Sequence, residues 1–442
     1  MKHSPRDIAL EIVRRLQTAG FSAFWVGGSV RDFLLGRQPQ DFDIATDAKP
    51  DEVEKLFKRT IAVGKKFGVM VVLEQEHQFQ VATFRAESDY QDGRRPETVH
   101  FSSARADAVR RDFTVNGLFY DPVAKVTHDW VDGEKDLKSR VIRTIGAPEE
   151  RFAEDHLRLL RAIRFAAQLD FQIDPKTFAA VRALAPKIRL ISAERIRDEL
   201  LKLFLPPHAA RGLDLLRDSG LMAQVLPELM ATIACEQSPD YHPEGSVYNH
   251  IRLMLSQLPP EASPSLAWSV ILHDIAKPAT AAADPATGRI HFYEHEKVGA
   301  AMAEKILERL RFPRNEIDDI VACVRQHMQF KDVRQMRKAT LRRLLLRETF
   351  PLEMELHKLD CLGSHRQLDL YDFLVEQAAE LKKKPEIHPP LLTGNDLIEL
   401  GMKPGPKMGA LLEEIRDKQL AEELTSARAA RTWAKKRLQS IK

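Results

Sequence analysis

The chain has 442 residues, of which 44% are hydrophobic and 30% are charged, and its net charge is only +3. This length exceeds what one hydrophobic core supports, so we expect two to four domains in a soluble globular protein. The N-terminus shows no apolar signal-peptide core, and no apolar run approaches the length of a membrane span. We therefore expect a cytoplasmic protein without a membrane partner. Three widely spaced cysteines argue against a disulfide framework or a cysteine zinc site.

The first 145 residues carry the signals of a small mixed sheet with helices. Residues 4–20 predict an amphipathic helix, because Ser4 and Pro5 stand at its start and Gly20 at its end. Strand patterns follow at residues 24–26, 41–46, 69–73 and 79–85, with a helical pattern at 51–58. These elements predict an α+β head.

Residues 24–46 hold the most informative pattern. An apolar strand leads into the turn Gly28-Ser29 and a short helix, and a second strand carries Asp41 and Asp43 on either side of Phe42. Alternate strand residues point to one face, so both carboxylates are predicted to converge while Phe42 enters the core. Converging carboxylates suit Mg²⁺, and a helix start suits an anion. The pattern indicates a site for a nucleoside triphosphate, the alternative being that the aspartates only cap a turn.

After residue 145 the pattern becomes helical, which marks a domain boundary. Helices are predicted at residues 152–169, 175–184, 193–205 and 209–219. The predicted fold class is α+β, a small mixed-sheet head followed by an all-helical body. Its expected domains are residues 1–145, 146–235, 236–383 and 384–442.

The stretch from Phe24 to Thr46 resembles the signature of the DNA polymerase β nucleotidyltransferase superfamily, most closely the class II tRNA nucleotidyltransferases and bacterial poly(A) polymerases. The resemblance continues, in the family's order, through residues 83–85, 90–96, 110–116, 154–158 and 194–199. It implies a polymerase β-like head, a helical nucleotide-selecting and RNA-binding domain after it, and an RNA-binding C-terminal tail. It also implies a flexible loop over residues 85–92. Gln80 departs from the family, which usually has an acid there, so Asp41 and Asp43 are left as the two catalytic metal ligands.

Arginines dominate the predicted nucleotide site, because guanidinium groups bind triphosphate oxygens better than lysines do. The alternative for the Arg94-Arg95 and Arg110-Arg111 pairs is surface solubility. The resemblance implies that Asp112 reads the ribose hydroxyl. The predicted nucleotide-binding residues are Gly28, Ser29, Arg31, Arg94, Arg95, Arg111, Asp112, Asn116, Asp155, Arg158, Arg161 and Arg164.

Asp155 and Arg158 carry a prediction about base selection. Three positions apart on a helix, they would share a face, where a surface ion pair is the alternative role. Cytosine and adenine both present an exocyclic amine beside an acceptor ring nitrogen. A carboxylate that accepts from the amine and a guanidinium that donates to the nitrogen would select both bases. The pair is therefore predicted to act as a protein template for C and A.

A histidine-rich region follows. Its residues His250, His273, Asp274 and Asp360 occur in the order of an HD-type phosphohydrolase site, and residues 272–278 resemble the core of that site. His295 and His327 lie where two-metal members carry further ligands. Imidazole and carboxylate ligands suit a divalent transition metal that would activate water against a phosphoester. The alternative is a helical RNA-binding body whose histidines are satisfied by hydrogen bonds.

Two basic stretches, residues 334–347 and 428–442, suit an RNA backbone or a solvated helix face. We predict a template-independent, Mg²⁺-dependent enzyme that adds CCA to tRNA 3′ ends from CTP and ATP by two-metal transfer. The alternatives are an A-adding or CC-adding enzyme, a poly(A) polymerase acting on other RNA 3′ ends, and an HD-type phosphohydrolase. The oligomeric state is left open.

Overall fold

The computed structural model describes residues 4–39, 41–65, 68–90, 96–238, 242–287, 289–383 and 389–441. The chain divides into two compact units, Met1–Met230 and Ala231–Lys442. Each unit is described by itself.

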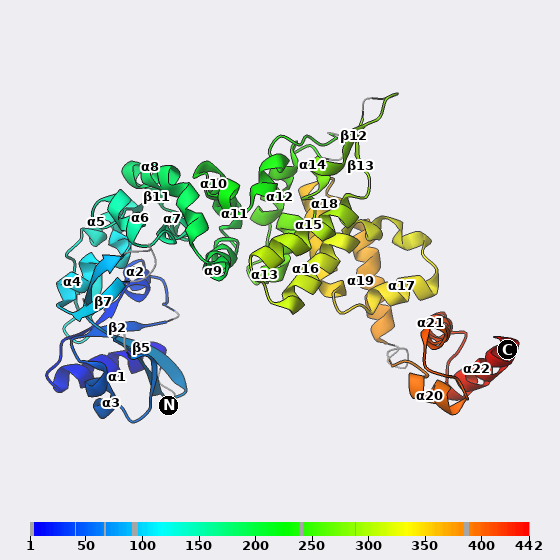
Figure 1. Ribbon diagram of the computed structural model, residues 1–442, viewed down its shortest axis with the longest axis horizontal. Coiled ribbons are helices and arrows are strands. Elements are labelled where there is room, and N and C mark those ends of the chain that lie inside the picture. Colours follow the sequence, from blue (N-terminus) through cyan, green and yellow to red (C-terminus); the bar gives the residue numbers. More distant parts are fainter. Residues whose placement is uncertain are drawn as a thin grey trace. The chain divides into compact units, whose positions relative to one another are not determined.

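The first unit begins with α1 (Pro5–Thr18), whose start is fixed by a capping box between Ser4 and Asp7. The helix lies against a seven-stranded sheet (Figure 1). The strand order is β3-β4-β5-β2-β1-β8-β9. The strands are β1 (Ala23–Val26), β2 (Asp43–Thr46), β3 (Thr60–Gly64), β4 (Val69–Glu74), β5 (His77–Thr83), β8 (Phe119–Asp121) and β9 (Val126–His128). Among the described pairs of this sheet, β2 runs parallel to β5 and the other pairs are antiparallel, so the sheet is mixed as predicted.

The head contains more strands than its patterns predicted. Strand β6 (Arg85–Tyr90) pairs with β7 (Pro96–Phe101) in a separate hairpin, where a flexible loop was expected, and residues 91–95 lie outside the described residues. Strands β3, β8 and β9 were also missed, because three- to five-residue strands carry too little alternation to be recognised. The helices of the head are α2 (Gly28–Leu34), α3 (Pro50–Leu56), α4 (Ala104–Val109) and α5 (Gly133–Ser139), with a 3₁₀ turn η2 (Thr114–Asn116).

Helices build the rest of the first unit. They are α6 (Pro148–Glu154), α7 (Arg158–Leu169), α8 (Pro175–Leu184), η3 (Ala185–Leu190), α9 (Ala193–Leu203), α10 (Ala209–Asp218) and α11 (Met222–Val225). A short parallel pair, β10 (Val141–Ile142) with β11 (Gln172–Ile173), ties the end of the head to the segment after α7.

The single helix predicted over residues 152–169 is wrong, because the chain breaks at Asp155. This residue is extended, with φ −149° and ψ 105°. Its carboxylate accepts a hydrogen bond from the backbone N–H of Leu157 at 3.1 Å. An aspartate that bonds the backbone in this way competes with helical hydrogen bonding. Helix α7 therefore starts anew at Arg158.

Among its described residues, the second unit is helical apart from one hairpin, β12 (Ala281–Ala283) with β13 (Ile290–Phe292). Its helices are α12 (Val247–Ser256), α13 (Pro264–Leu272), α14 (Lys277–Thr280), α15 (His295–Arg309), α16 (Arg314–Gln326), η5 (His327–Gln335), α17 (Lys338–Leu345), α18 (Phe350–Gly363), α19 (Asp369–Lys382), α20 (Gly394–Glu399), α21 (Pro406–Leu420) and α22 (Ala427–Ile441). A 3₁₀ helix, η4 (Pro227–Thr232), spans the point in the chain where the first unit ends and the second begins. Helices α20 to α22 share their own apolar cluster, which includes Leu397, Leu411 and Ile415. Across the described residues, every helix is too short or too polar to cross a membrane.

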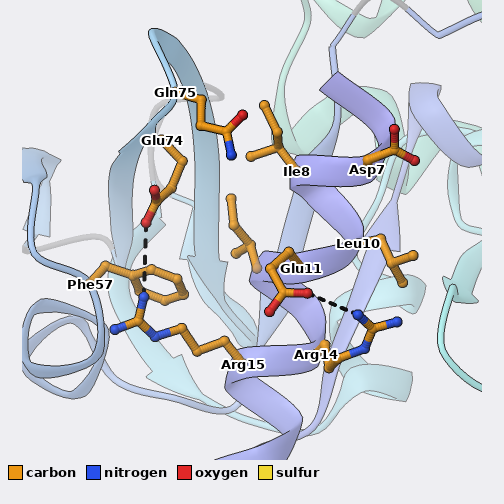
Figure 2. Close-up of a pocket in the computed structure, with 10 residues that line it drawn as sticks. Asp7, Ile8, Leu10, Glu11, Arg14, Arg15, Phe57, Glu74 and Gln75 are labelled. Atoms are coloured by element: carbon orange, nitrogen blue, oxygen red, sulfur yellow. Dashed lines mark hydrogen bonds and ion pairs between the residues drawn. The ribbon is translucent and has the colours of Figure 1, made fainter. Parts of the chain in front are cut away.

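A cavity of about 570 Å³ lies between α1 and the turn that joins β4 to β5. Figure 2 shows Arg15 reaching across it to Glu74, with the ring of Phe57 beside its guanidinium. None of the predicted site residues lines this cavity.

Candidate active site and metal centre

The turn between β1 and α2 has room for glycine only. Gly27 has a φ of 70°, and a Cβ there would lie 2.9 Å from a guanidinium nitrogen of Arg111. Ser29 donates its hydroxyl to the carbonyl of Val26 at 2.9 Å, so its side chain stabilises the turn. Gly28 follows without a clash and begins α2. The glycines thus let an arginine approach the start of α2.

Burial alternates about Phe42 as predicted, although β2 begins at Asp43 and Asp41 precedes the strand. Both are exposed, whereas Phe42 between them is 4% exposed and packs on Trp25 with ring centroids 4.7 Å apart. Although Asp43 reaches solvent, the protein around it desolvates its carboxylate and raises its pKa, and the charge of Asp41 adds to this rise while Arg111 opposes it. Two carboxylates that repel each other at a solvent-accessible position fit a divalent cation.

Gln80 stands beside Asp43 on the neighbouring strand. Strands β2 and β5 are parallel with Ile44 opposite Val81, so the residues one position earlier, Asp43 and Gln80, are adjacent and share a face. Both are exposed. A neutral amide therefore occupies the place next to the two carboxylates.

Arg111 is held at this position by a buried acid. Asp107, 2% exposed, pairs with the guanidinium of Arg111 at 3.0 Å and with that of Arg110 at 2.6 Å. Burial alone would raise the pKa of Asp107, but the two cations outweigh burial and lower it. Arg111 also lies over the ring of Phe119. Sequence analysis missed Asp107, whose only signal was its position one helical turn before the arginine pair.

Asp112 and Asn116 are hydrogen-bonded to each other inside a buried network. The amide of Asn116 donates to Asp112 at 3.2 Å and accepts from Arg31 at 2.7 Å. The second oxygen of Asp112 accepts two hydrogen bonds from Arg161, at 2.6 and 2.8 Å. Burial opposes the charge of Asp112, but Arg161 and Arg158 outweigh it and lower the pKa of Asp112 to about 2. Asp112 is therefore a charged group with its oxygens already engaged.

The network extends along α7 to α9. Glu199 accepts a hydrogen bond from Arg164 at 2.5 Å and lies 3.8 Å from Arg161. The ring of Phe165 is within 5.3 Å of three guanidinium carbons, those of Arg31, Arg161 and Arg164. Cations from the head and from α7 thus meet on one aromatic ring.

Asp155 and Arg158 lie on either side of a helix break, and each pairs with another residue. The carboxylate of Asp155 accepts from Arg195 of α9 at 2.7 and 3.2 Å. Arg158 donates to Glu154 and, at 3.0 Å, to the carbonyl of Arg151. The shared helical face predicted for them is wrong, for the reason given above. Arg195 was missed as a site residue, because its partner is 40 positions away.

Five of the predicted nucleotide-binding residues are thus connected in one network, which joins Arg31, Asn116, Asp112 and Arg161 and reaches Arg164 through Glu199. Arg94 and Arg95 lie outside the described residues.

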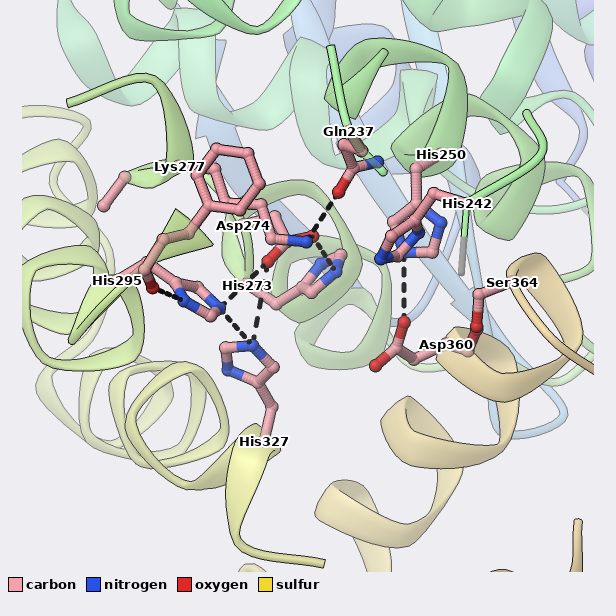
Figure 3. A network of polar contacts seen from close by, with 12 residues as sticks. Gln237, His242, His250, His273, Asp274, Lys277, His295, His327, Asp360 and Ser364 are labelled. Atoms are coloured by element: carbon pink, nitrogen blue, oxygen red, sulfur yellow. Dashed lines mark hydrogen bonds and ion pairs between the residues drawn. The ribbon is translucent and has the colours of Figure 1, made fainter. Parts of the chain in front are cut away.

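The second unit gathers the predicted HD residues into a histidine centre, made of His250, His273, Asp274, His295, His327 and Asp360 (Figure 3). Asp274 lies 3.1 Å from His273, 3.3 Å from His295 and 3.7 Å from His327. Asp360 lies 3.1 Å from His250. His250 lies on α12, His273 and Asp274 at the end of α13, and Asp360 on α18. His295 begins α15 and His327 begins η5.

The histidine centre has the chemistry of a metal site. His273 Nε2 and Asp274 Oδ1 are buried, yet neither makes a hydrogen bond of good geometry. The Nε2 atoms of His295 and His327 face each other at 3.1 Å. Burial and the neighbouring His273 lower the pKa of His327 to about 3, so this imidazole stays neutral, as a ligand must. Imidazole and carboxylate donors with unmet bonds fit a divalent metal ion.

Lys277 and Gln237 complete the surroundings. The ammonium of Lys277 lies 2.7 Å from Asp274 and donates to Gln237 at 2.6 Å. Sequence analysis gave neither residue a role. Lys277 lies inside the recognised stretch 272–278, whereas Gln237 stands in a loose segment without a pattern.

Three family models match successive parts of the chain. The family model "Poly A polymerase head domain" matches residues 23–143, "Probable RNA and SrmB- binding site of polymerase A" matches residues 170–233, and "HD domain" matches residues 240–362. Fold and site together define a nucleotidyltransferase with an appended HD domain. The predicted fold class is confirmed.

Three relatives identify the kind of nucleotidyltransferase to which the chain is similar. A CCA-adding enzyme of Streptococcus pyogenes is 34% identical over 416 residues, which cover 92% of this chain and 90% of the relative. One from Enterococcus faecalis is 47% identical over 206 residues, which cover 46% of this chain and 50% of that relative. The crystal structure of the Bacillus stearothermophilus CCA-adding enzyme in complex with CTP has a TM-score of 0.75 at 28% identity and 99% coverage of both chains. The chain belongs to the family of CCA-adding enzymes.

Proposed function

We propose that this protein adds C and A residues to the 3′ end of tRNA from CTP and ATP, with Asp41 and Asp43 at the reacting centre. The observation that carries the proposal is the exposed pair of carboxylates beside Arg111 at the start of α2. Membership of the CCA-adding family supplies the product. The A-adding, CC-adding, poly(A)-adding and purely hydrolytic alternatives are not favoured.

Asp41 and Asp43 would hold Mg²⁺, which when bound neutralises charge on the triphosphate and lowers the pKa of the attacking hydroxyl. Around it, Arg111 offers a guanidinium to triphosphate oxygens, kept in place by Asp107. Exposure of both carboxylates leaves room for an RNA end and a nucleotide together. The head therefore orients the reactants and balances their charge.

Asp155 and Arg158 would select the base after exchanging partners. Arg195 and Glu154 satisfy them now, so neither charge is left unpaired before a nucleotide arrives. An incoming cytosine or adenine offers the carboxylate an amine donor and the guanidinium a ring-nitrogen acceptor. Uracil and guanine offer the opposite pattern and would leave two partly buried charges unpaired.

The product test uses three RNAs: tRNA lacking CCA, tRNA ending in CC, and an unstructured RNA. CTP and ATP are supplied separately and together, and product lengths are read. We expect CC from CTP alone on the first RNA, a single A from ATP on the second, and little addition to the third. Long A tails on the unstructured RNA would contradict the proposal.

Helix α22 supplies a surface for the RNA backbone. Arg428, Lys435 and Lys436 are exposed on it and have no ion-pair partner within the described part of the chain, while Ala430 and Ala434 face the apolar cluster. The other basic stretch differs, because Lys338 pairs with Glu422 and Arg343 with Asp417 and Glu413. We therefore assign RNA binding to α22 and packing to residues 334–347.

A double substitution, Lys435→Ala with Lys436→Ala, tests this assignment. We expect weaker tRNA binding and a salt dependence, the slope of log K against log salt, that is smaller by about 2. Lys338→Ala is the matched control, since it removes a lysine that is already paired. Equal effects of both changes would overturn the assignment.

A second candidate function belongs to the histidine centre. Its buried atoms without hydrogen bonds favour a bound divalent transition metal, which when present supplies an activated water for phosphoester hydrolysis. Metal analysis of purified wild-type protein and of His273→Ala tests this. We expect metal in the wild type and its loss in the variant.

We also propose that the protein acts in the cytoplasm, where tRNA and nucleotides meet.

A further inference from the structure

The four histidines of the histidine centre all present Nε2 to its interior, but they are not held alike. In three of them Nδ1 contacts a backbone carbonyl three residues earlier: His273 with Val270 at 2.9 Å, His295 with Phe292 at 2.7 Å, and His327 with Val324 at 2.7 Å. Such a bond fixes the proton on Nδ1 and leaves Nε2 free as a ligand. The fold of the chain itself therefore orients these three rings.

His250 uses a side chain for the same purpose. Its Nδ1 lies 2.6 Å from Oε1 of Glu244, and its Nε2 lies 3.1 Å from Asp360. The ring of His250 is fully buried and the side chain of Glu244 is 9% exposed. The second oxygen of Glu244 is buried without a hydrogen-bond partner. A carboxylate thus stands where the other three rings have a carbonyl.

The segment before α12 holds Glu244 firmly. Gly245 donates its N–H to the carbonyl of His242, and the side-chain amide of Asn249 donates to the carbonyl of Glu244. The ring of His242 also contacts Oε1 of Glu244 through Nδ1 at 2.9 Å. The backbone of Glu244 is therefore fixed by the turn, and its Oε1 is fixed by the ring of His242.

We propose that Glu244 is a positioning residue of the metal centre: it accepts the Nδ1 proton of His250 and so aims Nε2 at the metal beside Asp360. The inference rests on the proposed metal site. Metal-bound histidines commonly donate their second N–H to a carboxylate or carbonyl, and loss of such a partner weakens metal affinity by about 10- to 100-fold. Of the four rings, His250 is the one whose Nδ1 partner is a side chain, so a single substitution can remove that partner.

The test is metal affinity, measured by competition between the full-length protein and a chelator for Zn²⁺ or Mn²⁺. Glu244→Gln should weaken affinity about 10- to 100-fold with the number of bound ions unchanged, and Glu244→Asp should fall between it and the wild type. The visible spectrum of the Co²⁺-loaded protein should change in the same variants. Glu236→Gln, the same chemical change at an exposed acid in the same segment, is the control and should match the wild type.

Melting of the metal-free proteins checks that the variants fold. Wild-type affinity and spectrum in folded Glu244→Gln would overturn the inference. Loss of one whole ion with unchanged affinity for the rest would also overturn it, because Glu244 would then bind an ion with His242 and His250. Wild-type protein that binds no ion at all would remove the metal centre itself, and the inference with it.

Discussion

In the first unit the buried charges are paired with one another, whereas the histidine centre of the second unit leaves buried polar atoms without hydrogen bonds. Asp112, Arg161 and Glu199 form a closed network, and Asp41 and Asp43, the proposed metal ligands, are exposed and lie outside it. In the histidine centre, His273 Nε2 and Asp274 Oδ1 are buried without a hydrogen bond of good geometry. The buried charges of the first unit are thus paired by the protein itself, while the histidine centre keeps buried donor atoms of the kind that suit a small ion.

The largest effect should come from Asp43→Asn. Removing one of the two proposed metal ligands should lower the rate of nucleotide addition roughly 1,000-fold. Thermal unfolding should not change, because Asp43 is exposed and outside the network. Single-turnover incorporation of CTP, with the melting curve as control, measures both. A large loss of stability would show that the carboxylates belong to the scaffold.

Metal should stabilise the second unit. An ion at 100 times its dissociation constant contributes about 2.7 kcal/mol to the free energy of unfolding, through its preference for the folded state. Melting curves with and without a chelator should therefore separate for the wild type and coincide for His273→Ala. Nucleotide addition by His273→Ala should stay within about twofold of the wild type, provided that Mg²⁺ is present. A parallel loss of addition would break the contrast between the two sites.

Asp155→Ala tests whether Asp155 takes part in the proposed selection of the base. We expect discrimination of CTP and ATP against UTP and GTP to fall by up to about 100-fold, since one well-placed base contact carries about 1–3 kcal/mol. Arg195→Ala should weaken discrimination less, because Arg195 holds Asp155 without reading the base. Incorporation of all four nucleotides is the measurement. Discrimination that survives in Asp155→Ala would sink the template assignment.

Asp112→Asn measures how much the closed network stabilises the first unit. The pKa of Asp112 is about 2 against an ordinary 3.8, which corresponds to about 2 kcal/mol at neutral pH. Because the folded-state pKa is the lower one, this stabilisation is present above pH 3.8 and disappears as the pH falls through 2. The variant should unfold more easily at pH 7, and the difference from wild type should shrink on acidification. A constant difference across this range would contradict the pairing.

Local patterns predicted the parts of the site that depend on neighbours in the chain. Alternation about Phe42 predicted that this ring is buried between two exposed carboxylates, because a strand has a two-residue period wherever it lies. The stretch 272–278 indicated the histidine centre, and the change from strands to helices after residue 145 indicated the helical body. The predicted domain boundaries and the role of each nucleotide-binding residue stay predictions.

The partners of these residues were decided by the tertiary structure. Arg195 meets Asp155 from 40 positions away, and Lys338, Arg342 and Arg343 pair with acids of α21 and with Glu422. The helix break at Asp155, by contrast, is local, because its carboxylate accepts from the backbone N–H of Leu157. The sequence by itself therefore determined which chemical groups the protein carries and the period with which they repeat. Which charge neutralises which was left to the folded chain, because that depends on contacts between distant segments.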